Sequence, residues 1–130
     1  MERVVDLDDA AARIAARAPG WRAARLTVGP LTWRDWLAPW PQPLETDRAR
    51  VVDPDSVGLR LADPLTGAEL EVVLFCGGWA DVSYLAAGWE EKLVTAGEHE
   101  SGGAIPAQDI TSAADFEARL TGWTGDVFGG

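Results

Sequence analysis

The chain of 130 residues is 47% hydrophobic, which is enough to bury the core of a single domain, residues 1–130, without disulfides or a metal. A single cysteine, Cys76, cannot form an internal disulfide, and this favours a reducing, cytoplasmic location. One cysteine and one histidine, His99, are too few for a zinc site, and we expect no cofactor. All of the net charge of −10 lies after Arg60, where only Lys92 and Arg119 face twelve acidic residues, and such an acidic half repels nucleic acid.

The first segment, residues 6–18, predicts a helix. Asp6 or Asp8 can cap it, and arginines follow in its later turns, as the helix dipole prefers. Its apolar stripe consists mostly of small side chains, which suits packing against a sheet. We expect the helix to end at Pro19-Gly20 and a short strand to follow at residues 25–28.

Three tryptophans dominate the next segment. Trp33, Trp36 and Trp40 follow helical spacing together with Leu37, which predicts one or two turns of helix before a run of prolines. Two interpretations stay open at this point. The helix can turn its tryptophans into the core or over a sheet edge, or Trp33, Trp36 and Trp40 can form an aromatic platform for a flat ligand such as a carbohydrate. A strand is expected next, at residues 48–52.

The stretch from Val57 to Leu85 predicts three antiparallel strands joined by turns at Asp63–Gly67 and at the two residues Gly77-Gly78. Because side chains alternate along a strand, one face of the middle strand is apolar and the other grades from acidic to aromatic. The apolar face consists of Leu70, Val72, Leu74 and Cys76, and the graded face of Glu69, Glu71, Val73 and Phe75. The aromatic end of the graded face, continued by Trp79, needs cover from a helix, a loop or another molecule.

The last third predicts a fourth meander strand at residues 89–96, a polar loop at residues 98–103 and a firm helix at residues 113–121. Ser112 can cap that helix and Asp115 stands at the matching capping position. The expected fold class is therefore α+β, with an antiparallel meander sheet of four to six strands and a helix from each end of the chain packed against it.

Residues for catalysis do not form a recognisable set. His99 stands between two glutamates in a polar loop, Cys76 lies within a strand pattern, and no serine has a nucleophile motif around it. Phosphate-binding and dinucleotide-binding glycine patterns are absent. We therefore expect a binding protein rather than an enzyme, with no catalytic residue and no metal ligand. Abundant arginine and a single lysine are typical of a GC-rich bacterial genome.

The segments LEVVLFCGGWADVSYL, Leu70–Leu85, and ITSAADFEARL, Ile110–Leu120, give the chain a layout that resembles the small immunity proteins of bacterial polymorphic toxin systems. The resemblance implies a cytoplasmic, non-enzymatic protein that binds one toxin domain and occludes its active site. It also gives the acidic half a use, since toxins that attack nucleic acid present basic clefts. The resemblance assigns a role to no individual residue.

The expected contact set for a basic protein partner, such as a toxin domain, lies on the graded face and on the strand expected after it. It consists of Glu69, Glu71, Trp79, Asp81, Glu90 and Glu91. The alternatives are a small-ligand or carbohydrate-binding domain that uses Trp33, Trp36 and Trp40, and an enzyme accessory subunit. We expect no nucleic acid as partner, because the acidic half repels it. We also expect no membrane, because no stretch reaches the length of a membrane span. The oligomeric state stays open.

Overall fold

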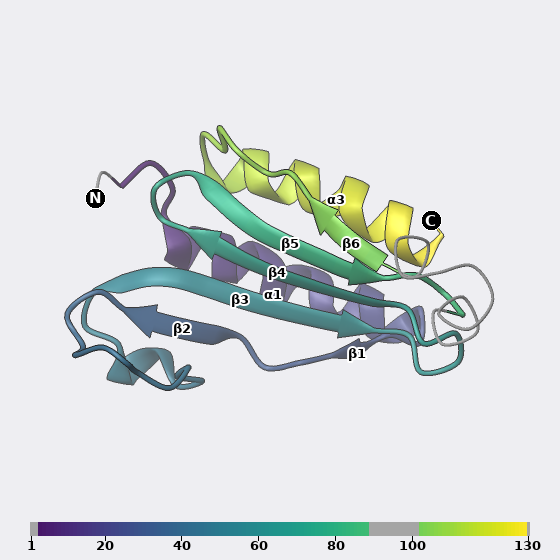
Figure 1. The fold of residues 1–130 in the computed structure, drawn as a ribbon, viewed down its shortest axis with the longest axis horizontal. Coiled ribbons are helices and arrows are strands. Elements are labelled where there is room, and N and C mark those ends of the chain that lie inside the picture. Colours follow the sequence, from purple (N-terminus) through teal and green to yellow (C-terminus); the bar gives the residue numbers. More distant parts are fainter. Residues whose placement is uncertain (1–2, 89–101, 130) are drawn as a thin grey trace.

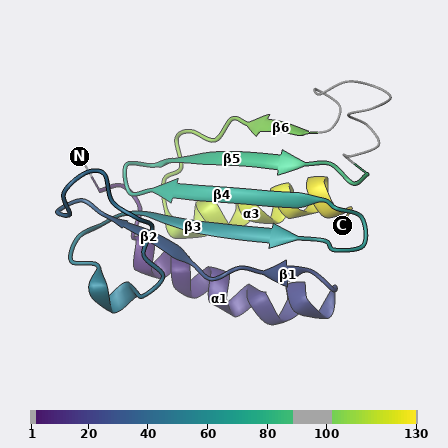
Figure 2. The ribbon, with the colours of Figure 1, turned by 60° about the horizontal axis from the view of Figure 1, so that its bottom comes forward.

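The structure is a computed structural model that describes residues 3–88 and 102–129, and it confirms the α+β fold class. Within these residues the antiparallel sheet has six strands in the spatial order β1-β3-β4-β5-β6, with β2 also paired to β3. Figure 2 shows β1 and β2 following one another along the same edge of β3. The strands are β1 (Thr27–Val28), β2 (Thr32–Asp35), β3 (Pro54–Ala62), β4 (Glu69–Phe75), β5 (Trp79–Leu85) and β6 (Gly102–Ile105).

Both helices, α1 (Leu7–Ala23) and α3 (Ala113–Phe128), pack on the same face of the sheet (Figure 1). The core lies between them and the sheet, and it includes the apolar face predicted for the middle strand. The buried side chains of that core include Ile14, Val57, Leu59, Leu61, Leu70, Val72, Leu74, Cys76, Phe116 and Leu120. Among the described residues, no helix is long and apolar enough to cross a membrane.

Helix α1 continues through Pro19 to Ala23, so the prediction that Pro19-Gly20 ends it is wrong. The added turn brings Trp21 into the core, where it is 8% exposed, and this burial offsets the backbone hydrogen bond that proline cannot donate. The chain turns away two residues after the helix, at Arg25, whose φ of 70° lies in the left-handed region. There the N–H of Leu26 donates to the carbonyl of Trp21 at 3.0 Å, and that of Arg25 to Arg22 at 2.9 Å.

The helix predicted around Trp33–Trp40 is also wrong, because the segment forms strand β2 followed by a loop. Trp33 pairs with Val57 of β3 on one side and with Glu45 on the other, so strand pairing outweighs the helical spacing of the tryptophans. The strand predicted at residues 48–52 is a short 3₁₀ helix, Arg48–Arg50, which Asp47 caps by accepting the N–H of Ala49 at 3.0 Å.

The two turns of the meander occur where the sequence predicts them. Gly67 has a φ of 81° in the first, and Gly78 a φ of 96° in the second. The second turn is one residue longer than predicted, because Phe75 pairs with Trp79 and leaves Cys76 in the loop with both glycines. A three-residue hairpin loop requires a left-handed residue at its end, which explains glycine at position 78.

The C-terminal part differs from the prediction in length. Strand β6 begins at Gly102, inside the expected polar loop, and pairs with β5. Helix α3 continues past residue 121 to Phe128. The side chain of Phe128 is partly buried against the core, and this packing stabilises the additional turns. The predicted strand at residues 89–96, with Glu90 and Glu91, and the loop histidine His99 lie outside the described residues.

Candidate partner-docking surface

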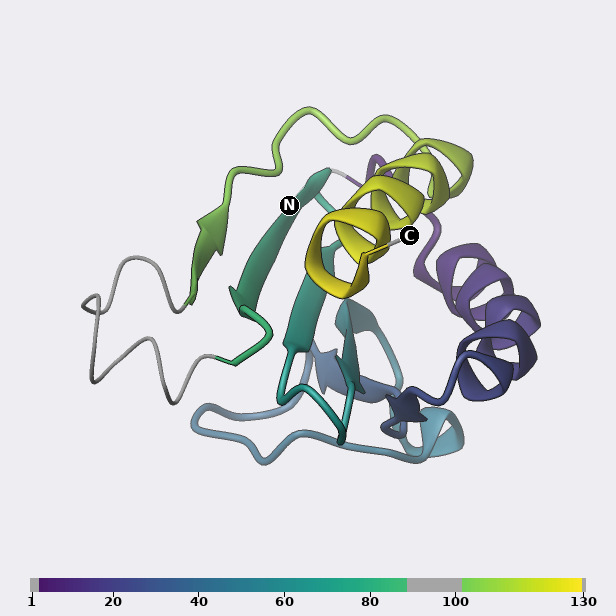
Figure 3. The ribbon, with the colours of Figure 1, turned by 90° about the vertical axis from the view of Figure 1, so that its right-hand side faces the viewer.

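The sheet has a second face that points away from both helices, here called the open face. Figure 3 shows α1 and α3 together on one side of the sheet, and within residues 3–88 and 102–129 no helix lies on the other side. Alternation along β4 and β5 places Glu71, Val73, Phe75, Trp79 and Asp81 on this face, because their neighbours are the buried core residues.

Aromatic side chains form one end of the open face. The rings of Phe75 and Trp79 stack with centroids 5.1 Å apart and planes 14° from parallel. The guanidinium of Arg34 on β2 lies 5.9 Å from the ring of Phe75 and 4.7 Å from that of Trp40. Trp79, Phe75, Arg34 and Trp40 therefore make a continuous row, here called the aromatic row, in which cation–π contacts join the strand residues to the loop after β2.

The position of the Trp79 ring depends on Gly77. A Cβ at position 77 would lie 2.2 Å from Cζ3 of Trp79, so the ring folds back over a part of the hairpin that must be bare backbone. In this place it stacks on Phe75 and stays half-buried. Gly77 thus leaves room for the Trp79 ring, whereas Gly78 provides the left-handed backbone conformation of the turn.

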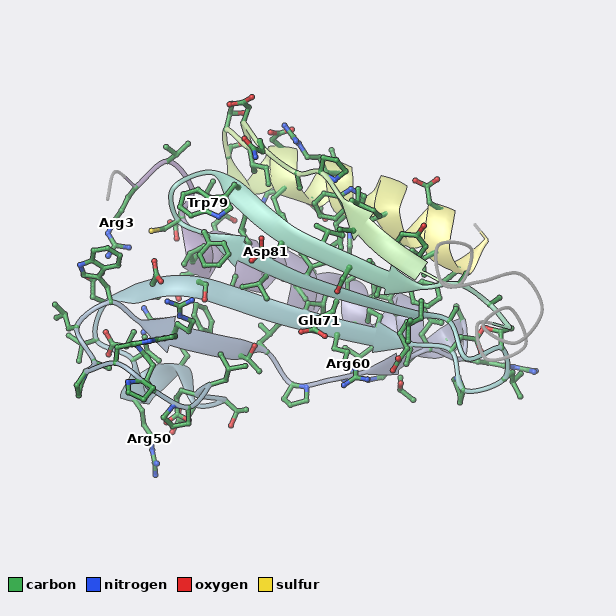
Figure 4. The ribbon with its side chains drawn as sticks, in the orientation of Figure 1. Arg3, Arg50, Arg60, Glu71, Trp79 and Asp81 are labelled. Atoms are coloured by element: carbon green, nitrogen blue, oxygen red, sulfur yellow. The ribbon has the colours of Figure 1, made fainter. Side chains whose placement is uncertain are left out.

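Carboxylates lie beside the aromatic row. Asp81 pairs with Val73, and Glu71 with Ser83, so these two acidic residues are diagonal neighbours on adjacent strands, and both are exposed. Figure 4 shows Asp81 and Glu71 following Trp79 along the open face. Within the described residues, no side chain forms a hydrogen bond or ion pair with Glu71 or Asp81. Both are therefore available to a cationic partner.

Arg60, next along the same face, is already engaged. Its Nη2 donates to Oε1 of Glu69 at 2.6 Å, and this hydrogen bond, with smaller contributions from the charges of Glu69 and Glu71, raises the pKa of the guanidinium. Glu69 is thus already paired with a cation of its own chain at the surface of the sheet. The excess negative charge of this part of the sheet lies on Glu71 and Asp81.

A hollow of about 580 Å³ lies between β5 and residues 104–108. Its lining includes Trp79, Asp81, Ser83, Val73 and Glu71, so it contains both aromatic and acidic groups. Smaller hollows of about 240 and 210 Å³ open near Arg60 on the same face. The volume of the first falls in the range of about 300–1,000 Å³ that is usual for ligand sites.

Arg34 is held in place by a buried acid. The side chain of Asp55 is only 6% exposed, and its Oδ2 lies 3.4 Å from Nη2 of Arg34. Its Oδ1, and Nε of Arg34, hydrogen-bond to no described group. The ion pair fixes the guanidinium between the rings of Trp40 and Phe75. The sequence does not indicate that Arg34 belongs to this surface. It predicts a helix here, whereas the position of Arg34 depends on β2 being a strand.

The loop after β2 presents large apolar side chains to solvent. Trp36 is 53%, Leu37 63%, Trp40 69% and Leu44 60% exposed. We call this segment, residues 36–44, the tryptophan loop. Trp33 is 3% exposed and belongs to the core, so it cannot face a ligand together with Trp36 and Trp40. Of the predicted contact residues, Glu69, Glu71, Trp79 and Asp81 share the open face, with Glu69 at the end of β4 that lies away from Trp79.

Among the residues that the structure describes, this surface has no exposed cysteine and no histidine. Burial raises the pKa of the Cys76 thiol, which lies on the helix-covered side of the sheet. The described part of the chain holds no group of three or more side chains placed to bind a metal. Aromatic rings next to unpaired carboxylates are suited to binding. No protein-family model matches the chain, and no curated protein or solved structure is significantly similar to it.

Proposed function

We propose that the protein is a non-enzymatic binding protein whose open face docks on a basic protein partner. The observation that carries this proposal is that Asp81, and beyond it Glu71, follow the stacked rings of Phe75 and Trp79 on the open face, and that neither carboxylate forms a hydrogen bond or ion pair with a described residue. Aromatic side chains on a rigid sheet supply contact area at low entropic cost. Carboxylates that become buried in an interface require cationic partners, since an unpaired buried charge is strongly unfavourable.

In its specific form, the proposal is an immunity protein that neutralises a cognate bacterial toxin by occluding the toxin's active site. The acidic second half of the chain supports this form, because a nuclease-like toxin presents a basic cleft that attracts it. The resemblance of Leu70–Leu85 and Ile110–Leu120 to immunity proteins agrees with it. The partner is then expected in the reading frame next to that of this chain.

The test compares two charge reversals that change the net charge equally. Asp81→Lys alters the open face, whereas Asp126→Lys alters an exposed position of α3 on the opposite side. Binding to the product of the adjacent reading frame is measured by titration calorimetry. We expect a Kd below about 1 μM, weakened about tenfold or more by Asp81→Lys and little by Asp126→Lys. Absence of a complex, or equal effects of the two substitutions, contradicts the proposal.

A second candidate function rests on the exposure of Trp36 and Trp40, at 53% and 69%. Two exposed tryptophans in one loop also suit a small flat ligand such as a carbohydrate, which stacks on aromatic rings. The two functions differ in what changes the tryptophan fluorescence. A shift with oligosaccharides alone supports the second function, whereas a shift that needs a protein partner supports the first.

A further inference from the structure

We infer that the tryptophan loop is the apolar half of the docking surface and contacts the same basic protein as the open face. This inference rests on the proposed function and adds to it a second part of the interface. The open face then provides the charged half, through Glu71 and Asp81. The loop provides Trp36, Leu37, Trp40 and Leu44.

Asp35 and Gln42 use their side chains for hydrogen bonds that hold the backbone of the loop. The carboxylate of Asp35 accepts backbone N–H groups from the loop and from the segment before β3: Leu37 at 3.0 Å, Val52 at 2.8 Å and Asp53 at 3.1 Å. The N–H of Trp36 donates to the carbonyl of Asp53 at 2.7 Å. One acidic side chain thus satisfies donors that solvent would otherwise satisfy, and it fixes the first turn of the loop.

The far side of the loop is anchored as well. Gln42 accepts the N–H of Asp35 at 3.0 Å and donates to its carbonyl at 2.8 Å, so its amide imitates a strand partner. Two backbone hydrogen bonds between Trp33 and Glu45, at 2.7 and 3.0 Å, close the loop at its base. The backbone is therefore held at both ends and in the middle. Side chains on such a frame lose little freedom when a partner binds them.

The side chains that the loop exposes to solvent are apolar, unlike those of an ordinary connecting loop. An ordinary surface loop exposes polar groups and turns its apolar ones inward. Here four large apolar side chains are each more than half exposed, while Asp35 and Gln42 are used for internal hydrogen bonds. Clustered exposed apolar side chains mark sites of interaction.

The loop and the open face form one surface. The guanidinium of Arg34 lies 4.7 Å from the ring of Trp40 in the loop and 5.9 Å from that of Phe75 on the sheet. Because the buried carboxylate of Asp55 holds Arg34, the two rings keep a fixed relation. A partner that covers Phe75 and Trp79 therefore meets the loop at the edge of the same contact.

The charge of the chain favours a basic partner over other occupants of the loop. Two copies of a chain with a net charge of −10 repel each other, and so does an anionic membrane surface. A basic protein is attracted by the open face and brought to the loop by that attraction. In such an interface the charged half sets the association rate, and the apolar half sets the dissociation rate.

The experiment measures binding kinetics with the product of the adjacent reading frame immobilised on a sensor. Leu37→Ala and Trp36→Ala are compared with Leu65→Ala, which removes a 77% exposed leucine from the turn between β3 and β4. We expect each loop substitution to speed dissociation about tenfold with little change in association, and Leu65→Ala to change neither. Thermal unfolding of each variant shows that the fold is kept.

The outcomes separate the two proposals. If Leu37→Ala and Trp36→Ala bind like Leu65→Ala while Asp81→Lys weakens binding, the role of the loop is overturned and the proposed function stands. If the wild-type chain forms no complex, both are overturned. Self-association in the ultracentrifuge at neutral pH that Leu37→Ala removes, or binding to phosphatidylcholine and phosphatidylglycerol vesicles, assigns the loop to another occupant and overturns the inference.

Discussion

Gly78 joins the hairpin of the sheet to the segment that leads into α3. Its carbonyl accepts the N–H of Ile110 at 2.8 Å, and its own N–H donates to Phe75 at 3.1 Å. Its φ of 96° lies in the left-handed region, and a Cβ at this position would lie 2.8 Å from the carbonyl oxygen of Ile110. Glycine is required here twice, for the backbone conformation and for the close approach of a second segment.

Gly78→Ala is therefore expected to destabilise the protein more than Gly88→Ala. Gly88 has a φ of 69°, but no atom lies within 4 Å of its missing Cβ, so only the conformational strain applies. We expect a loss of about 1 kcal/mol for Gly88→Ala and about 2–4 kcal/mol for Gly78→Ala, measured by urea unfolding. Equal losses would show that the contact with Ile110 relaxes at no cost.

The residues of the open face differ in how well their positions can be predicted from the sequence. Glu71, Val73, Phe75, Trp79 and Asp81 were predicted on one face, because strand alternation and the turn glycines are local signals. The position of Arg34 is not predicted, because its neighbours follow helical spacing. Its contacts with Asp55 and Phe75 also join distant parts of the chain. The spacing of the tryptophans between positions 33 and 40 holds no information about such long-range contacts.

Among the elements, α1 and α3 are joined by an ion-pair cluster on their outer surface. Glu117 of α3 accepts Nε of Arg17 at 2.8 Å and Nη1 of Arg13 at 2.9 Å. The hydrogen bonds from Arg17 and then Arg13 lower the pKa of the Glu117 carboxyl below its ordinary value. The folded protein therefore binds a proton at Glu117 less readily than the unfolded chain does.

This difference gives a pH dependence with a defined sign. A carboxyl with a lowered pKa in the folded state contributes stability above its unfolded pKa, and this contribution is lost as the pH falls through the folded pKa. Between about pH 6 and pH 3, the Tm of the wild type is expected to fall more steeply than that of Glu117→Gln, which cannot titrate at this position. Parallel Tm curves in differential scanning calorimetry would contradict a role of this cluster in joining the helices.

The predicted and observed elements differ where distant contacts outweigh local preference. Strands β3 to β5 and both helices were predicted, because their patterns and caps are strong. The end of α1 was misplaced, since burial of Trp21 outweighs the cost of Pro19. Strand β6 was missed because Gly102–Ile105 has little strand preference of its own and forms by pairing with β5.

On the scale of the whole molecule, charge is unevenly distributed. The chain is neutral up to Arg60, and the rest carries the net charge of −10. The tryptophan loop lies in the neutral part, while Glu71 and Asp81 lie in the acidic part. The sheet brings the two parts together, so that an attractive field and an apolar contact act on the same side.

Salt is expected to separate these two contributions. Raising the NaCl concentration from about 50 to about 500 mM shortens the screening length several-fold, and we expect association with the basic partner to slow about tenfold or more. Dissociation is expected to change little, because it depends on the apolar contact of the loop. Stopped-flow fluorescence of the tryptophans measures both rates. An association rate that does not depend on salt would contradict electrostatic attraction as the source of recognition.

The internal hydrogen bonds of the tryptophan loop also have an evolutionary consequence. Asp35 and Gln42 hold the loop through backbone groups, and these bonds do not depend on which side chains stand at positions 36, 37 and 44. Those positions can therefore be exchanged without disturbing the core. A lineage that has to follow a changing partner can alter its specificity there in single steps, while the sheet and helices stay under unchanged selection for stability.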